Sequence, residues 1–378
     1  MNILIFIIIL LVLVLVHEFG HFFTAKKFGI RVDEFGFGFP PKIYGKKYGE
    51  TEYSLNLLPI GGFVKIFGEN PDDENTFGPD ASRSFVNKPK WQQAIVLFAG
   101  VFANLLLAWF LFSIGFMSGL PTSVSGESAG YKLSNINLTV VSVLEKSPAQ
   151  IAGLKSGDKI ISLASGKDSV SDINPDTLKS FILSHSKKPA RNATQSVAGG
   201  EITVGYIRGQ DKNINLAVVT PVINKTNNIP EIGISMDMIG TVKLPLFSAL
   251  KEGMSLTWFI TKGTVLGLYT LIAEGIQGKG SFSSVTGPVG MVGIVGDAYQ
   301  FGFVYLLSFT ALISVNLAII NLLPFPALDG GRLFFLLIEK IKGSRINPKF
   351  ANTANMIGFG ILIILMLAVT YHDIVKLF

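Results

Sequence analysis

Residues 2–25 read NILIFIIILLVLVLVHEFGHFFTA, an apolar run that carries His17, Glu18 and His21 near its end. About 20 residues of helix cross the hydrocarbon core of a bilayer, so the run is long enough to span one. A signal peptide would begin with basic residues and end at a small-residue cleavage site, and neither is present here. We therefore expect a retained transmembrane helix.

The polar end of this run has the pattern H-E-x-x-H. Residues four apart lie on one face of a helix, so His17 and His21 can both reach one metal ion. Glu18 projects about 100° round the helix from His17, where it can hold a water molecule. Zinc lowers the pKa of such a water to about 7, which lets Glu18 accept its proton. The alternative is a polar cluster at the headgroups, but unpaired polar groups inside a membrane are rare.

A second polar feature ends a later apolar run, where residues 321–331 read NLLPFPALDGG. Two prolines interrupt the run and two glycines follow a single acid, Asp329. This backbone can turn a carboxylate back toward the helices, which predicts Asp329 as the third protein ligand. The alternative is an interfacial turn in which Asp329 caps the helix predicted at 332–342.

Composition supports a membrane protein. Of the 378 residues, 49% are hydrophobic and only 15% are charged, whereas soluble domains carry about 25% charged residues. Lys262 lies in the middle of a further apolar stretch, residues 254–273, and a lysine at the bilayer centre costs roughly 2.5–3.5 kcal/mol, so we predict a membrane-surface helix there. The four predicted spans are residues 2–25, 92–120, 301–323 and 354–370.

Composition also excludes some classes of site and partner. Cysteine is absent, so disulfides and thiolate metal sites are excluded. The net charge is +6, but no basic helix with interleaved aromatic residues suggests nucleic acid.

Lysine and arginine predict the orientation. They cluster in the segments after the first and third spans and are absent between Lys90 and Lys132 and between Lys279 and Arg332. The positive-inside rule places the two basic segments in the cytoplasm, with both termini and residues 121–300 outside. His21 and Asp329 then lie near the same, inner face of the membrane.

The first cytoplasmic segment is itself apolar. Residues 34–44 and 51–67 are aromatic, Gly/Pro-rich or strand-like, and each is too short for a helical span. Non-helical backbone at membrane depth needs protein or a wet cavity beside it. We predict a re-entrant β-hairpin beside the metal site, with a soluble loop as the alternative.

Four parts follow from these patterns. Residues 121–240 mix strand-like runs with a helical patch at 175–185, which indicates one small α+β domain outside the membrane. The fold class is an α-helical polytopic membrane protein with about four transmembrane helices, a re-entrant β-hairpin and this one inserted domain. The parts are residues 1–120 (spans one and two with the hairpin), 121–240 (the inserted domain), 241–300 (amphipathic, on the membrane surface) and 301–378 (spans three and four).

These motifs together resemble the site-2 protease family of intramembrane zinc metalloproteases, in the bacterial form with an extracytoplasmic PDZ domain. The resemblance covers nearly the whole chain and implies one zinc held by His17, His21 and Asp329, with Glu18 as the catalytic residue. It implies substrates that are transmembrane segments of single-span proteins, or their trimmed stubs, cut after a first extracytoplasmic cleavage. It also implies a multi-pass protein of the bacterial inner membrane, with its active site near the cytoplasmic side.

The resemblance extends to further residues. Asn316 and Asn321 match family asparagines implicated in holding the substrate, with hydrogen bonds to neighbouring helices as the alternative. Gly61 and Gly62 match the family's re-entrant loop, while residues 100–104 keep the Gly and Asn of the family's G-P-x-x-N but lack its proline. The PDZ consensus G-L-x-x-G-D is matched by Gly153, Leu154, Gly157 and Asp158.

Two rival functions belong to other classes. A catalytically silent adaptor could use the PDZ-like domain alone, but such adaptors can lose the glutamate that is intact here as Glu18. A metal transporter would spread polar residues along several spans, whereas here they gather at one level. The sequence does not fix the oligomeric state.

Overall fold

The computed structural model describes residues 1–70, 73–124, 131–186, 200–209, 211, 213–224, 229–278 and 286–377. The chain divides into two compact units. The first unit comprises Met1–Ile114, Phe247–Gly296 and Leu307–Phe378, and the second comprises Gly115–Leu246 and Asp297–Leu306.

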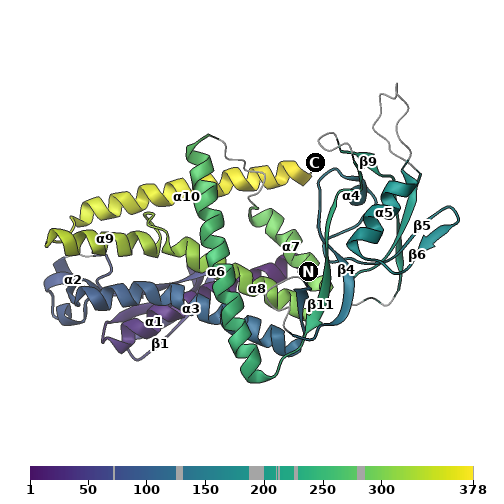
Figure 1. Ribbon diagram of the computed structural model, residues 1–378. Helices are drawn as coiled ribbons and strands as arrows, with labels where there is room; N and C mark the ends of the chain where they lie inside the picture. The colour runs from purple at the N-terminus through teal and green to yellow at the C-terminus, as the bar shows by residue number, and fades with distance from the viewer. Residues whose placement is uncertain are drawn as a thin grey trace. The chain divides into compact units, whose positions relative to one another are not determined.

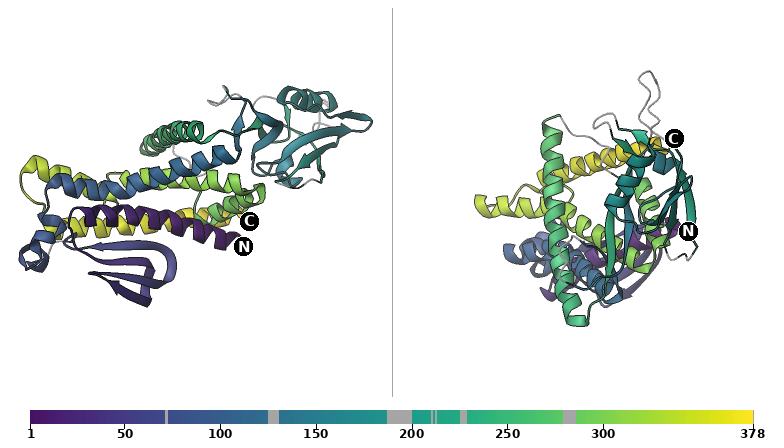
Figure 2. Two further views of the ribbon diagram at one scale, coloured as in Figure 1. Left: turned by 90° about the horizontal axis from the view of Figure 1, so that it is seen from below. Right: turned by 45° about the vertical axis from the view of Figure 1, so that its right-hand side comes forward.

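Long helices build the first unit, and α1, α3, α8 and α10 run side by side in the views of Figures 1 and 2. Five helices in the described part of the chain are long and apolar enough to cross a membrane. These five are α1 (Asn2–Lys27), α3 (Lys90–Ser118), α6 (Leu246–Ile276), α8 (Phe303–Leu322) and α10 (Pro348–Leu377). Shorter helical elements are α2 (Asp73–Phe77), α7 (Pro288–Phe301), α9 (Asp329–Lys342) and the 3₁₀ turns Ala81–Arg83 and Phe85–Asn87.

Helix α1 buries one stripe of its surface. Its last turn carries Lys26 and Lys27, which complement the negative end of the helix dipole, and Gly29 follows in the left-handed region with φ of 66°. Because the buried residues are four apart, the two histidines continue the apolar stripe that packs against the bundle. The buried residues of α1 are Ile9, Leu13, His17, His21 and Ala25.

Helix α6 contains the predicted surface segment, residues 254–273. Figure 1 shows it crossing the direction of α1 and α10 steeply. Few of its residues are buried, and its length and composition would also allow it to span. The number of crossing helices, four or five, therefore stays a prediction.

The predicted hairpin is present beside α1 (Figure 2) and is longer than expected. It consists of β1 (Val32–Tyr48) and β2 (Thr51–Ile66), and it bends back on itself. Phe35 lies opposite both Tyr53 and Val64, whereas Tyr44 in the outer half of β1 lies opposite Leu55. The last part of β2 consequently forms one edge of a short sheet, next to α1.

The second unit contains a seven-stranded sheet in the described residues, with the order β3-β11-β4-β5-β7-β8 and β6 attached to β5. All its pairs are antiparallel. Its strands are β3 (Leu120–Ser123), β4 (Ser134–Val143), β5 (Lys159–Ser165), β6 (Asp168–Val170), β7 (Ile202–Ile207), β8 (Asn215–Val219) and β11 (Ile234–Val242). The unit also contains α4 (Pro148–Ile151), α5 (Pro175–His185) and the small pair β9 (Val222–Ile223) and β10 (Pro230–Glu231).

This unit has its own apolar core, as the inserted domain should. Buried side chains from the sheet pack against one face of α5, with Leu178, Phe181 and Ile182 on the helix side. The helix begins at an N-cap, Asn174, whose side chain accepts from the backbone of Thr177. The unit comprises Gly115–Leu246 and Asp297–Leu306, and the bounds 121–240 for an inserted domain stay a prediction.

Candidate metal centre

The two histidines of α1 point at the same carboxylate. His17 Nε2 lies 3.0 Å and His21 Nε2 lies 3.2 Å from Asp329 Oδ2. The two Nε2 atoms are themselves 3.2 Å apart. Both histidines are buried, and Asp329 keeps 20% of its side chain exposed. The residues predicted to hold a metal are therefore brought together from sequence positions more than 300 apart.

Asp329 is held by an irregular turn between α8 and α9. Ala327 has a φ of 76°, and its backbone N–H donates to Asn355 Oδ1 at 3.1 Å. A Cβ at Gly330 would lie 2.2 Å from the carbonyl oxygen of Leu322, and one at Gly331 would lie 2.2 Å from that of Phe325. The two glycines are thus required for the turn to close and to place Asp329 against α1.

The same contacts set the charge of the carboxylate. Burial alone would raise the pKa of Asp329, but hydrogen bonds and charge from His17 and His21 outweigh burial and hold that pKa well below its usual range. Asp329 is therefore ionised at neutral pH, as a metal ligand must be.

Helix α3 backs the histidines closely. His21 Nδ1 lies 2.8 Å from the carbonyl oxygen of Val96, which can only accept a hydrogen bond. Nδ1 therefore carries the ring proton, and the lone pair of Nε2 is available to a metal. A Cβ at Gly100 would lie 2.3 Å from His21 Nε2, and one at Gly20 would lie 2.3 Å from the carbonyl oxygen of Ala99. These two glycines allow α1 and α3 to approach with the imidazoles between them.

Glu18 lies next to the edge of the hairpin. The backbone of Val64 on β2 lies close enough to its carboxylate to interact with it electrostatically. A Cβ at Gly62 would come within 3.8 Å of Glu18 Cγ. Glu18 thus lies beside the edge of β2 and outside the group of His17, His21 and Asp329, and its role in activating water stays a prediction.

The three donors fit zinc. His17, His21 and Asp329 are the group of potential metal ligands found in the described residues, with ligand atoms within 4.8 Å of one another. Tetrahedral coordination with zinc–ligand bonds of 2.0–2.2 Å separates neighbouring donors by about 3.3 Å, close to the 3.0–3.2 Å seen here. Two imidazoles and one carboxylate are also a donor set of catalytic zinc sites, which keep a further position open.

Comparison with known proteins decides the family. A model of the family described as Peptidase family M50 matches residues 5–365. The chain belongs to this family.

Relatives of this M50 peptidase are similar over their whole lengths and are named as zinc metalloproteases. One from Clostridium perfringens is 36% identical, with 96% of this chain and 95% of the relative covered. Others are from Clostridium acetobutylicum (33% identical, 99% and 97% covered) and Fusobacterium nucleatum (31% identical, 100% of both covered). The protein is a zinc metalloprotease of the site-2 protease type, and its long apolar helices make it a multi-pass membrane protein.

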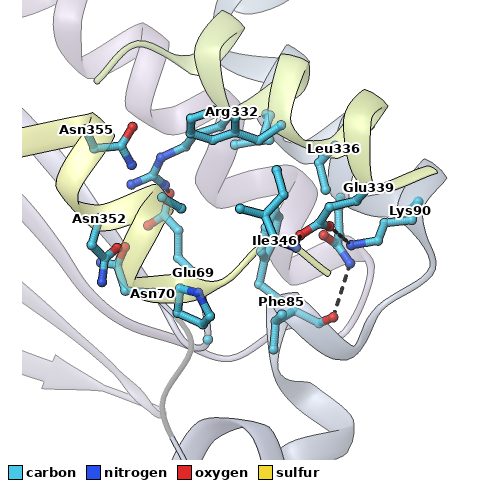
Figure 3. A pocket seen from close by; sticks show the side chains of 17 residues that line it. Glu69, Asn70, Phe85, Lys90, Arg332, Leu336, Glu339, Ile346, Asn352 and Asn355 are labelled. Carbon is cyan, nitrogen blue, oxygen red and sulfur yellow. Dashed lines mark hydrogen bonds and ion pairs between the residues drawn. The ribbon is translucent and has the colours of Figure 1, made fainter. Parts of the chain in front are cut away.

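Sequence reasoning missed the ion pairs that fix the helix carrying Asp329. Arg332, one turn along α9, pairs with Glu69 after β2, and Glu339 further along pairs with Lys90 of α3. Figure 3 shows these side chains around a cavity of about 100 Å³ that Asn352 and Asn355 also line. The sequence does show acidic residues among the lysines and arginines of the two basic segments. Which acid pairs with which base, however, depends on the fold.

The predicted substrate residues of the M50 peptidase occupy two places in the first unit. Asn316 on α8 accepts from Thr264 Oγ1 of α6 at 3.1 Å, and Asn321 lies one residue before the end of α8. Gly61, with φ of 107°, and Gly62 lie on the edge of β2. Their substrate-binding role stays a prediction.

The G-L-x-x-G-D residues form a tight turn in the second unit. Asp158 is fully buried and accepts from Arg208 and from the backbone N–H of Lys155, while Leu154 belongs to the core. Gly153 and Gly157 have φ values of 82° and 90°. The peptide-binding role of these four residues stays a prediction.

The second unit has a larger apolar cavity elsewhere. It measures about 430 Å³ and lies between α5 and the start of β11. None of the four turn residues lines it. Its walls include Leu144, Leu178, Ile182, Ile232, Gly233 and Ile234.

Proposed function

We propose that this M50 peptidase hydrolyses peptide bonds within transmembrane segments of single-span membrane proteins. The observation that carries the proposal is the position of the metal donors. His17 and His21 belong to an apolar helix long enough to span a bilayer, and they lie in its buried stripe. A site built there acts on a chain that lies at membrane depth.

The residues around the site divide the chemistry between them. Zinc, when bound, polarises the scissile carbonyl and lowers the pKa of water to about 7. Glu18 takes a proton from the attacking water and passes it to the nitrogen of the leaving amine. Asp329 and the two histidines hold the metal, and the carbonyl of Val96 keeps the His21 ring in its ligating form.

A transmembrane substrate must unwind before it can be cut, because a helix ties up its own carbonyls. The edge formed by residues 61–66 offers backbone groups to an extended chain, which would add as a further strand. Its support is the short distance to Glu18, since a Cβ at Gly62 would lie 3.8 Å from Glu18 Cγ. Asn316 and Asn321 would bond backbone groups freed by unwinding.

The second unit is proposed to be the extracytoplasmic PDZ-like domain. An antiparallel sheet, a helix and the apolar cavity between α5 and the start of β11 support this assignment. Strand addition beside a helix is the way PDZ domains bind peptide ends. The domain would screen substrates, so that cleavage follows a first cut that trims the ectodomain.

The proposal also includes a location and a topology. The protein would reside in the bacterial inner membrane, with both termini outside and the active site near the cytoplasmic face.

Cleavage products test this function and separate it from the rivals. Membranes from cells with wild-type protein and with Glu18→Gln are compared by mass spectrometry for peptides that end inside transmembrane segments. The amide still hydrogen-bonds but cannot accept a proton, so such fragments should fall by about 10²–10⁴-fold in rate of appearance while zinc is retained.

The other outcomes identify the alternatives. Equal fragment levels in the two strains would remove Glu18 from the mechanism. An adaptor would keep its cellular function in Glu18→Gln, and a transporter would move metal across vesicle membranes.

A further inference from the structure

Asn104 on α3 is a fully buried polar residue next to the metal ligands. Its Nδ2 lies 3.4 Å from His17 Nδ1, the ring nitrogen that faces away from Asp329. Its Oδ1 has no hydrogen-bond partner among the described residues. A buried amide oxygen without a partner costs about 1–3 kcal/mol, so its retention needs a reason.

The two histidines differ in what backs them. The ring of His21 is held by a carbonyl oxygen, which only accepts a hydrogen bond. The ring of His17 is backed by a side-chain amide, which can donate through Nδ2 or accept through Oδ1.

Metal binding decides which end of the amide is needed. A ligating imidazole gives the lone pair of one nitrogen to the metal and carries its proton on the other. His17 Nε2 faces Asp329 and His21, so in the metal-bound protein the proton of the neutral ring is on Nδ1. A proton on Nδ1 would face the NH₂ group of Asn104 as it stands, and two donors repel.

A half-turn of the amide about its terminal torsion removes this conflict. Amide torsions are roughly two-fold, and the oxygen and nitrogen ends have nearly the same shape, so the two orientations occupy nearly the same volume. We propose that Asn104 is a positioning residue for the metal, whose Oδ1 accepts the Nδ1–H of His17 when zinc is bound. The oxygen thereby gains a donor, Nδ2 moves to the position without a partner, and both histidines acquire an oxygen acceptor behind them.

The backbone around Asn104 suits this role. Ser314 Oγ on α8 donates to the Asn104 carbonyl at 2.8 Å, which ties α3 to the helix that leads to Asp329. The side chain is therefore held at a fixed distance from His17 while its amide remains able to turn.

Zinc affinity of the purified full chain tests the proposal, through competition with a chromophoric chelator in detergent. Asn104→Leu keeps the size but removes the acceptor and should weaken zinc binding by about 10–100-fold. Asn104→Asp keeps an acceptor and should stay within about threefold of wild type on the same scale. Ser113→Ala is the matched control, because Ser113 is a buried residue of the same helix whose Oγ, within the described part of the chain, bonds its own helix at Trp109.

Two results would overturn the assignment: Asn104→Leu binding zinc as tightly as wild type, or Asn104→Asp binding as weakly as Asn104→Leu. Since zinc affinity is measured without proteolysis, failure here leaves the proposed substrate class untouched.

Nuclear magnetic resonance of wild-type protein with ¹⁵N-labelled histidine provides a readout that needs no variant to fold. The chain has only four histidines. In the zinc-bound protein His17 should carry its proton on Nδ1 in a hydrogen bond. A bare Nδ1 would contradict the proposal.

Discussion

The two halves of the metal site hold their ligands by opposite means. His17 and His21 lie on a regular helix, and their spacing of four residues alone aligns them. Asp329 follows a turn in which Ala327 has a positive φ and Gly330 lies against the backbone of Leu322. Helical periodicity alone positions the histidines, whereas the position of Asp329 depends on a particular backbone path that contacts with nearby residues stabilise.

This difference predicts different sensitivities. A helix tolerates small backbone changes because many backbone hydrogen bonds stabilise it, whereas the turn depends on a few close contacts. Zinc retention and thermal stability in detergent should therefore respond much more strongly to changes in the turn than to matched changes in a helix.

Gly330→Ala should have the largest effect of the stability variants. The added Cβ would lie 2.2 Å from the carbonyl oxygen of Leu322, which no backbone can accept without moving. Overpacking of this kind typically costs about 1–3 kcal/mol, and here it also displaces Asp329. We expect a lower midpoint of thermal unfolding and loss of zinc on dialysis.

The matched control is Gly360→Ala within α10. A Cβ there meets nothing within 4 Å, and alanine favours a helix over glycine by about 1 kcal/mol. Stability should be unchanged or slightly higher and zinc should be kept. Equal effects of the two substitutions would mean that the turn is no more constrained than a helix.

Replacing alanine by glycine should shift the midpoint of thermal unfolding less than Gly330→Ala does. The shift should be upward in the turn and downward in a helix. Ala327→Gly relieves a left-handed alanine, worth about 1–2 kcal/mol, against an entropic cost of about 0.5–1 kcal/mol for glycine. The midpoint of thermal unfolding should rise slightly. Ala103→Gly in α3 should lower it, because glycine costs about 1 kcal/mol in a helix. A fall of the same size in both variants would contradict the strained turn.

The regular half of the molecule is also the half that sequence predicts well. The expected spans 2–25, 92–120, 301–323 and 354–370 each fall within or almost within one helix, and the helical patch at 175–185 coincides with α5. Apolar runs and helical spacing are local signals, so one sequence suffices to recognise them.

The irregular features were recovered only in part. Asp329 was predicted because two prolines and two glycines around one acid mark a turn. The pinning of Ala327 by Asn355, the pairing of Arg332 with Glu69 and the backing of His21 by Val96 were not. Each joins residues far apart in the chain, and no local pattern records which distant partner a polar side chain will meet.

The hairpin and the second unit show the same limit. The strand-like character of residues 34–44 and 51–67 was evident, but the bend that sets Phe35 between two segments of β2 was not. In the second unit, β11 and β3 went unpredicted, because strand formation depends on the neighbouring strands in the sheet as well as on a strand's own composition.

The central claim is that both halves hold one zinc, and metal content of the purified full chain tests it most directly. Wild type, His21→Ala and Asp329→Ala are compared with His185→Ala, a control on α5 whose ring pairs with Asp168 at 3.0 Å. We expect about one zinc per chain in wild type and in the control, and almost none in the other two, since three protein ligands define the site. Full zinc occupancy in Asp329→Ala would contradict the account, because the turn would then hold no ligand.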